Sequence, residues 1–208
     1  IDHPIFVESI RFIQARLDNT GLDALQQQVL ERLIHSSGDF DLQSLLRFSP
    51  NACQEGIAAI NSGSEILTDT AMAAAAVSPM ALRTSNSKVR TVLEWVPEKF
   101  VEGNTRTAIG IQHAWQELCN DLFNAPAPIV LIGSAPKALE ALLDMVDHGA
   151  ISPSLIIGMP VGFIGVSESK SRLSKSGLTH ILLEGTRGGA GLVSATMNAL
   201  LRASMTAS

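Results

Sequence analysis

Residues 149–170, GAISPSLIIGMPVGFIGVSESK, decide the fold class of this chain. The apolar run at 155–157 is typical of a buried strand, because it is short and ends at a glycine. A loop with Pro160 and Gly162 leads from there into a polar segment, starting at Ser167, that we predict to be helical. A strand, a glycine loop and a helix in this order form a ligand-binding junction in α/β proteins, since glycine lets backbone N–H groups approach a ligand closely.

The same alternation of short apolar runs and helical periodicity continues through the last two thirds of the chain. It predicts an α/β protein with an open, mainly parallel sheet and helices on both faces. We predict strands at 65–68, 89–95, 129–132, 155–157 and 180–183. We predict helices at 70–77, 105–123, 136–147, 167–175 and 190–203. Several of these strands end in glycine or a polar residue, so a ligand site is expected at the edge where the carboxyl ends of the strands lie.

The first third of the chain is predicted to be an N-terminal helical segment. Apolar residues recur there at helical spacing in two consecutive stretches: Phe6, Ile10, Ile13 and Leu17, then Leu22, Leu25, Val29 and Leu33. The second helix is expected to end at Gly38 in a left-handed cap. A third helix is predicted to start with Ser49 as N-cap and Pro50 at its first position, and to end just before Gly63.

Composition and charge exclude several classes of protein. With 208 residues, 46% of them hydrophobic and 17% charged, the chain is expected to form one globular domain, 1–208. A net charge of −5 argues against nucleic acid or an anionic membrane surface as the main partner. The two cysteines, Cys53 and Cys119, and the five histidines lack metal-ligand spacing, so no metal site is expected.

Residues 149–167 carry no charge, but prolines and glycines interrupt them and the continuous apolar run is too short to span a membrane. No signal-peptide pattern opens the given sequence, and the cysteines are those of a reduced protein. We therefore expect a cytoplasmic protein without a membrane partner.

Dinucleotide binding and nucleophilic catalysis are weakly supported. After the strand at 155–157 the glycines fall at 158, 162 and 165, which is not the G-x-G-x-x-G spacing, and no Walker sequence occurs. Ser134 lies in Gly-Ser-Ala-Pro rather than in a nucleophile elbow, and a helix N-cap explains it better. A nucleotide-dependent oxidoreductase is thus the less favoured class.

His35 is the strongest candidate for proton transfer. It lies at the predicted end of the second helix, where the helix dipole, Asp39 and Asp41 are expected to favour a positive imidazolium. A histidine placed in this way is a competent proton donor near neutral pH. A helix-capping histidine without another task explains the same position, and position alone favours that explanation.

Two arginines are candidates for binding a carboxylate or a phosphate. Arg106 is expected in the first turn of a long helix capped by Thr105, where an anion would compensate its position at the positive end of the dipole. Arg187 lies in a glycine loop after the last strand. A solvated surface arginine is the alternative for Arg106, and capping of the next helix accounts for Asp69.

Five segments together resemble one family, the precorrin-8X methylmutases of cobalamin biosynthesis. The resemblance runs from about Pro4 to Leu201, essentially the whole chain. The segments that carry it are His35-Ser36-Ser37-Gly38-Asp39-Phe40-Asp41, Phe48-Ser49-Pro50-Asn51-Ala52, Asn104-Thr105-Arg106-Thr107-Ala108, the loop from Gly158 to Gly165 followed by Glu168-Ser169-Lys170, and Arg187-Gly188-Gly189.

The resemblance implies an isomerase that moves a methyl group from carbon 11 to carbon 12 of precorrin-8X or cobalt-precorrin-8, giving hydrogenobyrinic acid or cobyrinic acid. It implies a Rossmann-like fold, a homodimer with active sites at the subunit interface, a tetrapyrrole substrate and no separate cofactor. By the same resemblance His35 is the catalytic proton donor and acceptor. The residues expected to bind substrate are Ser9, Asp69, Arg106, Gly158, Pro160, Gly162 and Arg187.

The chain departs from the family pattern at Ala71, Ser134 and Ala190, which weakens any site assignment there. The Asp39-Phe40-Asp41 variant favours the cobalt-containing substrate, and both substrates stay open. The alternative function is a corrinoid-binding or carrier protein of the same fold without catalysis, which the presence of His35 opposes.

Overall fold

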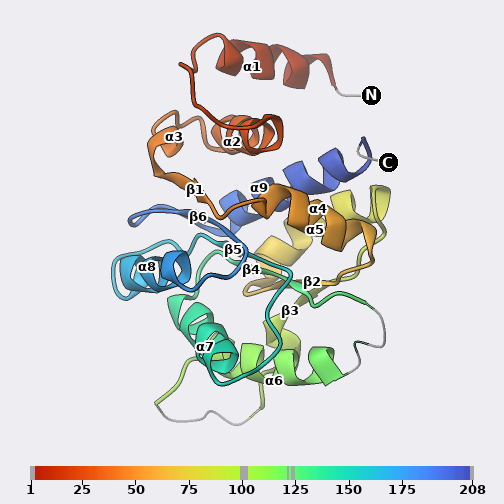
Figure 1. Cartoon of the computed structure of the whole chain (residues 1–208), viewed down its shortest axis with the longest axis vertical. Helices are drawn as coiled ribbons and strands as arrows, with labels where there is room; N and C mark the ends of the chain where they lie inside the picture. Colours follow the sequence, from red (N-terminus) through yellow and green to blue (C-terminus); the bar gives the residue numbers. More distant parts are fainter. Residues whose placement is uncertain (1–2, 99–102, 121, 123–124, 207–208) are drawn as a thin grey trace.

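The computed structural model describes residues 3–98, 103–120, 122 and 125–206, which form a six-stranded sheet covered by helices on both faces (Figure 1). The strands stand in the order β1-β6-β5-β4-β2-β3, and every neighbouring pair is parallel except β1 with β6. Their bounds are β1 Leu46–Phe48, β2 Ile66–Thr68, β3 Val89–Thr91, β4 Ile129–Ile132, β5 Leu155–Gly158 and β6 His180–Leu183. The predicted α/β class with a mainly parallel sheet is confirmed.

The helices form two layers. Helices α2, α4, α5 and α9 pack together on one face of the sheet, and α6, α7 and α8 cover the other, while α1 lies outside on α2 (Figure 1). Their bounds are α1 Pro4–Gln14, α2 Ala24–Ser37, α3 Leu42–Leu45, α4 Ala52–Asn61, α5 Ala71–Arg83, the 3-10 helix η1 Val92–Trp95, α6 Arg106–Asn120, α7 Pro136–Asp147, α8 Val166–Lys175 and α9 Ala190–Ser204. The predicted N-terminal helical segment is α1 to α4.

Strand residues divide alternately between two apolar cores. In β4, Ile129 and Leu131 point into the core under α9, whereas Val130 and Ile132 point into the core under α7. This alternation follows from the two-residue period of a strand. Each fully buried aliphatic side chain contributes about 1.5–3 kcal/mol, so burial on both faces holds the central strands in register.

Three predicted boundaries are wrong for physical reasons. The predicted strand 89–95 is a strand only to Thr91, because Thr91 and Glu94 form a capping box that starts η1. The predicted helix 70–77 continues to Arg83 through Pro79, since Ala81, beyond the proline, is buried in the core that α9 also lines. The helix predicted at 105–123 ends at Asn120, and residue 123 lies outside the described residues.

The start of α4 also differs from the prediction. Asn51, in the left-handed conformation with φ 57°, is the N-cap, not Ser49. The Ser49 hydroxyl instead accepts the His180 N–H at 2.8 Å and so extends the pairing of β1 with β6, a strand that the prediction lacked. Gly38 does end α2 in the left-handed conformation, with φ 68°, as predicted.

Three loops meet at the carboxyl edge of the sheet: residues 133–135 after β4, 159–165 after β5 and 184–189 after β6, called the edge loops below. The Gly189 N–H donates to the Met159 carbonyl at 2.9 Å, and the Gly162 N–H donates to the Thr186 carbonyl at 3.1 Å. A Cβ atom on Gly188 would lie 1.9 Å from the Met159 carbonyl oxygen, so only glycine permits this approach.

We predict that Gly188→Ala lowers the free energy of unfolding by about 1–3 kcal/mol, because the backbone of Met159 must move to admit the methyl group. Gly191→Ala is the matched control, since a Cβ atom there meets nothing within 4 Å. It should leave stability unchanged or raise it by up to about 1 kcal/mol. Urea denaturation measures both, and equal stability of the two variants would contradict the close approach.

Candidate active site

The glycine loop at residues 158–165 lies at the carboxyl edge of the sheet, as predicted. Gly158 is the last residue of β5 and is buried, and a Cβ atom there would lie 2.5 Å from Leu173. Pro160 is also buried, whereas Gly162 is half-buried with φ 137°. The structure thus gives Gly158 a packing task, whereas Gly162 stays partly accessible in the loop.

The tip of this loop is apolar and exposed. Val161, Phe163 and Ile164 expose 49%, 85% and 90% of their surface. Three large apolar residues within four positions of one loop are more than scattered surface residues, and such patches mark contact sites for ligands or proteins. Sequence reasoning had noted the glycines of this loop and not its apolar tip.

The structure brings together two residues that the resemblance placed in the site, Ser9 and His35. The Ser9 hydroxyl on α1 lies 2.9 Å from Nδ1 of His35 on α2. The Phe6 ring stands edge-on to the imidazole, with ring centroids 5.0 Å apart and an interplanar angle of 84°. One polar and one aromatic contact therefore orient the His35 ring from the side of α1.

The charge state of His35 differs from the prediction. Burial lowers the pKa of His35 below its ordinary value of 6.5, and the positive charge of Arg32 lowers it further. The Asp39 carboxylate, which was expected to raise this pKa, pairs with Arg187. In the free protein His35 is thus a neutral imidazole near pH 7, with a hydroxyl at Nδ1.

Arg187 connects the edge loop after β6 with the segment that follows α2. Its guanidinium binds Asp39 through Nη1 and lies 3.6 Å from Asp41 through Nη2. The Arg187 side chain remains 43% exposed, so it still offers donors to solvent or a ligand. This pair places the end of α2, one turn beyond His35, beside the edge loops.

Asp69 holds the loop after β4 through hydrogen bonds to its backbone. It is fully buried after β2, and its Oδ2 atom accepts the N–H groups of Gly133, Ser134 and Ala135 at 3.1, 2.7 and 2.9 Å. Burial raises the pKa of Asp69, although the three hydrogen bonds act in the opposite direction. The expected capping of the next helix is wrong, since the Thr70 hydroxyl caps α5. Asp69 holds the edge loop before α7 instead.

Lys170 is the residue that sequence reasoning missed, although it lies in a family motif. Its side chain is 2% exposed, and Nζ donates to the carbonyl oxygens of Gly185 and Arg187 at 2.8 and 2.6 Å. Burial lowers the pKa of Lys170 to about 8. Only the spatial contact of α8 with the loop after β6 shows this role, so no sequence pattern could have revealed it.

Arg106 lies apart from these contacts. It is the first residue of α6 and is exposed, and the Thr105 hydroxyl accepts the Ala108 N–H at 3.2 Å, which confirms the predicted cap. Within the described part of the chain, no hydrogen bond or ion pair joins Arg106 to His35 or to the edge loops.

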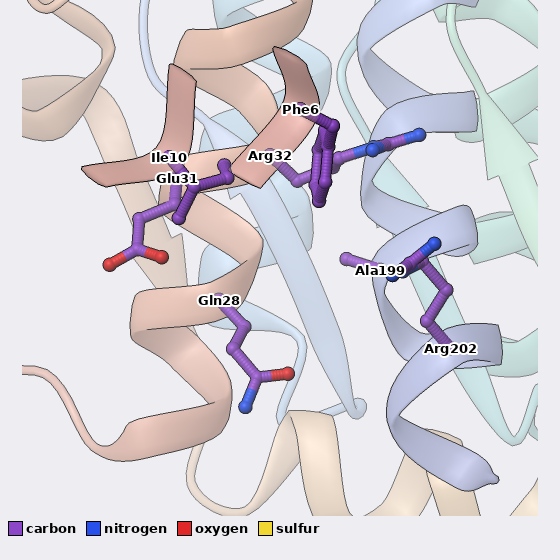
Figure 2. A pocket seen from close by; sticks show the side chains of 7 residues that line it. All are labelled: Phe6, Ile10, Gln28, Glu31, Arg32, Ala199 and Arg202. Atoms are coloured by element: carbon purple, nitrogen blue, oxygen red, sulfur yellow. The ribbon is translucent and has the colours of Figure 1, made fainter. Parts of the chain in front are cut away.

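A cavity of about 200 Å³ lies between α1, α2 and α9, close to the contact of Phe6 with His35 (Figure 2). Figure 2 shows the Phe6 ring beside Arg32, with Arg202 on the facing helix; the guanidinium carbons lie 4.9 and 5.3 Å from the ring centroid. Pockets for drug-sized ligands measure roughly 300–1,000 Å³, so this cavity is too small for a large ring.

In the part of the chain that the structure describes, no group of three or more His, Cys, Asp or Glu residues is arranged to hold a metal ion. None of the described helices combines the length and the apolar character that crossing a membrane requires.

Known proteins match this chain along nearly all of its length. The family model for precorrin-8X methylmutase matches residues 4–203. A precorrin-8X methylmutase of Pseudomonas aeruginosa is 38% identical, over 94% of this chain and 93% of the relative. A cobalt-precorrin-8 methylmutase of Synechocystis is 32% identical, over 97% of this chain and 95% of the relative. A crystal structure of precorrin-8X methylmutase from Thermus thermophilus superimposes with a TM-score of 0.85 at 33% identity. The superposition covers 98% of this chain and 96% of the other.

The family match runs from the start of α1, which carries Ser9, into the last turn of α9, and it includes α2, which carries His35. The matches include a solved structure with the same fold. The resemblance carried by the sequence motifs is confirmed, and the chain belongs to the precorrin-8X methylmutase family.

Proposed function

We propose that this chain moves a methyl group from carbon 11 to carbon 12 of precorrin-8X, or of cobalt-precorrin-8, giving hydrogenobyrinic acid or cobyrinic acid. Family membership carries the broader statement: the chain is a methylmutase, an isomerase of cobalamin biosynthesis. We propose further that residues 1–208 act as one domain in the cytoplasm. The family match over 4–203 and the two free thiols support this.

The carboxyl edge of the sheet suits a broad ring with carboxylates along its rim. The apolar tip at Val161, Phe163 and Ile164 offers a surface for the ring itself. Arg187, whose side chain is 43% exposed, offers donors for carboxylates, and forked guanidinium bonds suit them best. We assign Gly162 and Arg187 to direct contact, and Asp69, Gly158 and Pro160 to the buried support beneath it.

His35 is proposed to give a proton to the macrocycle, which promotes the methyl shift, and to take a proton back afterwards. The observation that carries this role is the Ser9 hydroxyl 2.9 Å from Nδ1. A hydroxyl that donates to Nδ1 leaves the ring proton on Nε2. A substrate that brings several carboxylates near the ring would raise the pKa of His35 and so favour the imidazolium.

Ser9 and Arg106 complete the proposed set. Ser9 is proposed to contact the substrate as well as the imidazole. Arg106 is exposed at the start of α6, so we propose that it reaches a peripheral carboxylate of the substrate. Asp39 of the Asp39-Phe40-Asp41 variant pairs with Arg187, and both the metal-free and the cobalt-containing substrate stay open.

The first test is turnover of metal-free and cobalt-containing substrate, followed by absorbance spectra. His35→Ala should lower the rate by about 10²–10⁴-fold, as expected for a lost general acid. His148→Ala is the control, because His148 is exposed at the end of α7 and its ring contacts the Asp144 carbonyl of its own helix. Turnover of His35→Ala at the wild-type rate would refute the role of His35. Product binding by the wild type without turnover would instead support the carrier alternative.

The second test is the titration of His35 by nuclear magnetic resonance. We expect a pKa below 6.5 in the free protein and a higher value in Arg32→Met, which removes the nearby positive charge. Arg83→Met, which alters a helix end distant in sequence, should leave it unchanged. Since the folded protein binds this proton more weakly than the unfolded chain, acidification below pH 6.5 should also cost stability. A value at or above 6.5 in the wild type would contradict this account.

We also propose that the chain is a homodimer with its active sites at the interface. The exposed apolar residues Phe163 and Ile164 at the edge, and Ile5 and Phe12 on the outlying helix α1, support this. Sedimentation should give about twice the chain mass of 22.1 kDa. Aspartate at both 163 and 164 should weaken the dimer.

Leu82→Asp is the control for the dimer test, because Leu82 is 73% exposed near the end of α5, which runs away from the carboxyl edge. It should leave the mass unchanged. A wild-type protein that sediments as a 22.1 kDa species would contradict the interface site.

A further inference from the structure

The ammonium group of Lys170 is buried without a carboxylate partner. Lys170 is 2% exposed, and in the described part of the chain its Nζ donates to two backbone carbonyl oxygens, those of Gly185 and Arg187. Among the described residues, no Asp or Glu lies within ion-pair distance of its Nζ. A buried charge is costly unless its hydrogen bonds compensate it, so a lysine here that only fills space would be better replaced by an apolar residue.

The position of Lys170 allows it to join two of the edge loops. It lies in α8, directly after the loop at 159–165, and both of its acceptors lie in the loop after β6. The two loops also exchange backbone bonds, from Gly162 to Thr186 and from Gly189 to Met159. Lys170 thus supplies the side-chain part of a contact between two loops.

The acceptor residue Arg187 extends this contact towards His35. The carbonyl of Arg187 binds Lys170 at 2.6 Å, while its guanidinium binds Asp39, which follows α2 by two residues. Lys170 fixes the backbone from which the Arg187 side chain projects. The direction of that side chain decides which groups it reaches.

We propose that Lys170 is a positioning residue for the methyl transfer: its ammonium clamps the turn at 185–187 and thereby holds Arg187 between the end of α2 and the carboxylates of the substrate. This inference rests on the proposed function for its catalytic consequence, and on the hydrogen bonds alone for the clamp itself. Nothing in it requires Lys170 to touch the substrate.

The test compares Lys170→Met, which has similar length and no donor, with Lys170→Arg, which keeps donors. A cavity of about 120 Å³ bordered by Lys170, Ser171 and Ser174 gives the longer side chain room. Lys175→Met is the matched control, because Lys175 is exposed on the same helix and its replacement changes the net charge equally. Lys170→Gln, also without a charge, replaces the methionine variant if that variant does not fold.

We expect Lys170→Met to lower kcat/KM by about 10–100-fold, since a misplacement of about 1 Å in a binding group has effects of that size. Lys170→Arg should recover most of the loss, and Lys175→Met should match the wild type. In the Arg187→Ala background the effect of Lys170→Met should shrink to within about 2-fold, because coupled residues are not additive. Full additivity of the two losses would overturn the proposal.

Amide hydrogen exchange tests the clamp without any substrate. The amides of Gly162 and Gly189 report the contact between the loops, and their protection should fall by about 10-fold in Lys170→Met and remain unchanged in Lys175→Met. Unchanged protection in Lys170→Met would overturn the clamp, whatever the activity. Reduced protection in a protein that turns over no substrate would support the clamp and refute the proposed function instead.

Discussion

The contact between the Met159 carbonyl and the backbone of Gly188 is the constraint on which the carboxyl edge of the sheet depends. A Cβ atom at Gly188 would lie 1.9 Å from that oxygen, so the two loops approach as closely as backbone permits. Neighbouring parallel strands bring the loops to the same edge, and glycine allows them to touch. The loop after β5 is thereby held on its buried side and presents Val161, Phe163 and Ile164 to solvent.

Two buried ionisable side chains, Asp69 and Lys170, complete this edge. Asp69 binds three backbone N–H groups before α7, and Lys170 binds two carbonyl oxygens after β6. Each satisfies backbone groups that a loop without regular structure would otherwise leave unpaired. The exposed pair of Arg187 with Asp39 adds little stability, because such pairs contribute about 0–1 kcal/mol. The pair matters for geometry, because it holds the end of α2 beside the edge loops.

Periodicity predicted most of the sheet, because β4, β5 and β6 are fully buried apolar runs. It failed at β1, whose three residues pair antiparallel at an edge and carry the exposed Arg47, so no apolar run marks them. In the site, the position of His35 at a helix end followed from local signals, whereas its lowered pKa depends on burial in the folded chain and on the charge of Arg32. Contacts between residues far apart in the sequence cannot be predicted from residue spacing.

The central claim is that the edge loops hold the substrate ring against His35. A crystal structure with the corrinoid product bound tests it most directly. The account predicts the ring on the apolar tip at Phe163 and Ile164, a carboxylate on Arg187, and the His35 imidazole within contact of the ring. A product bound elsewhere, with His35 facing solvent and the edge loops empty, would contradict it.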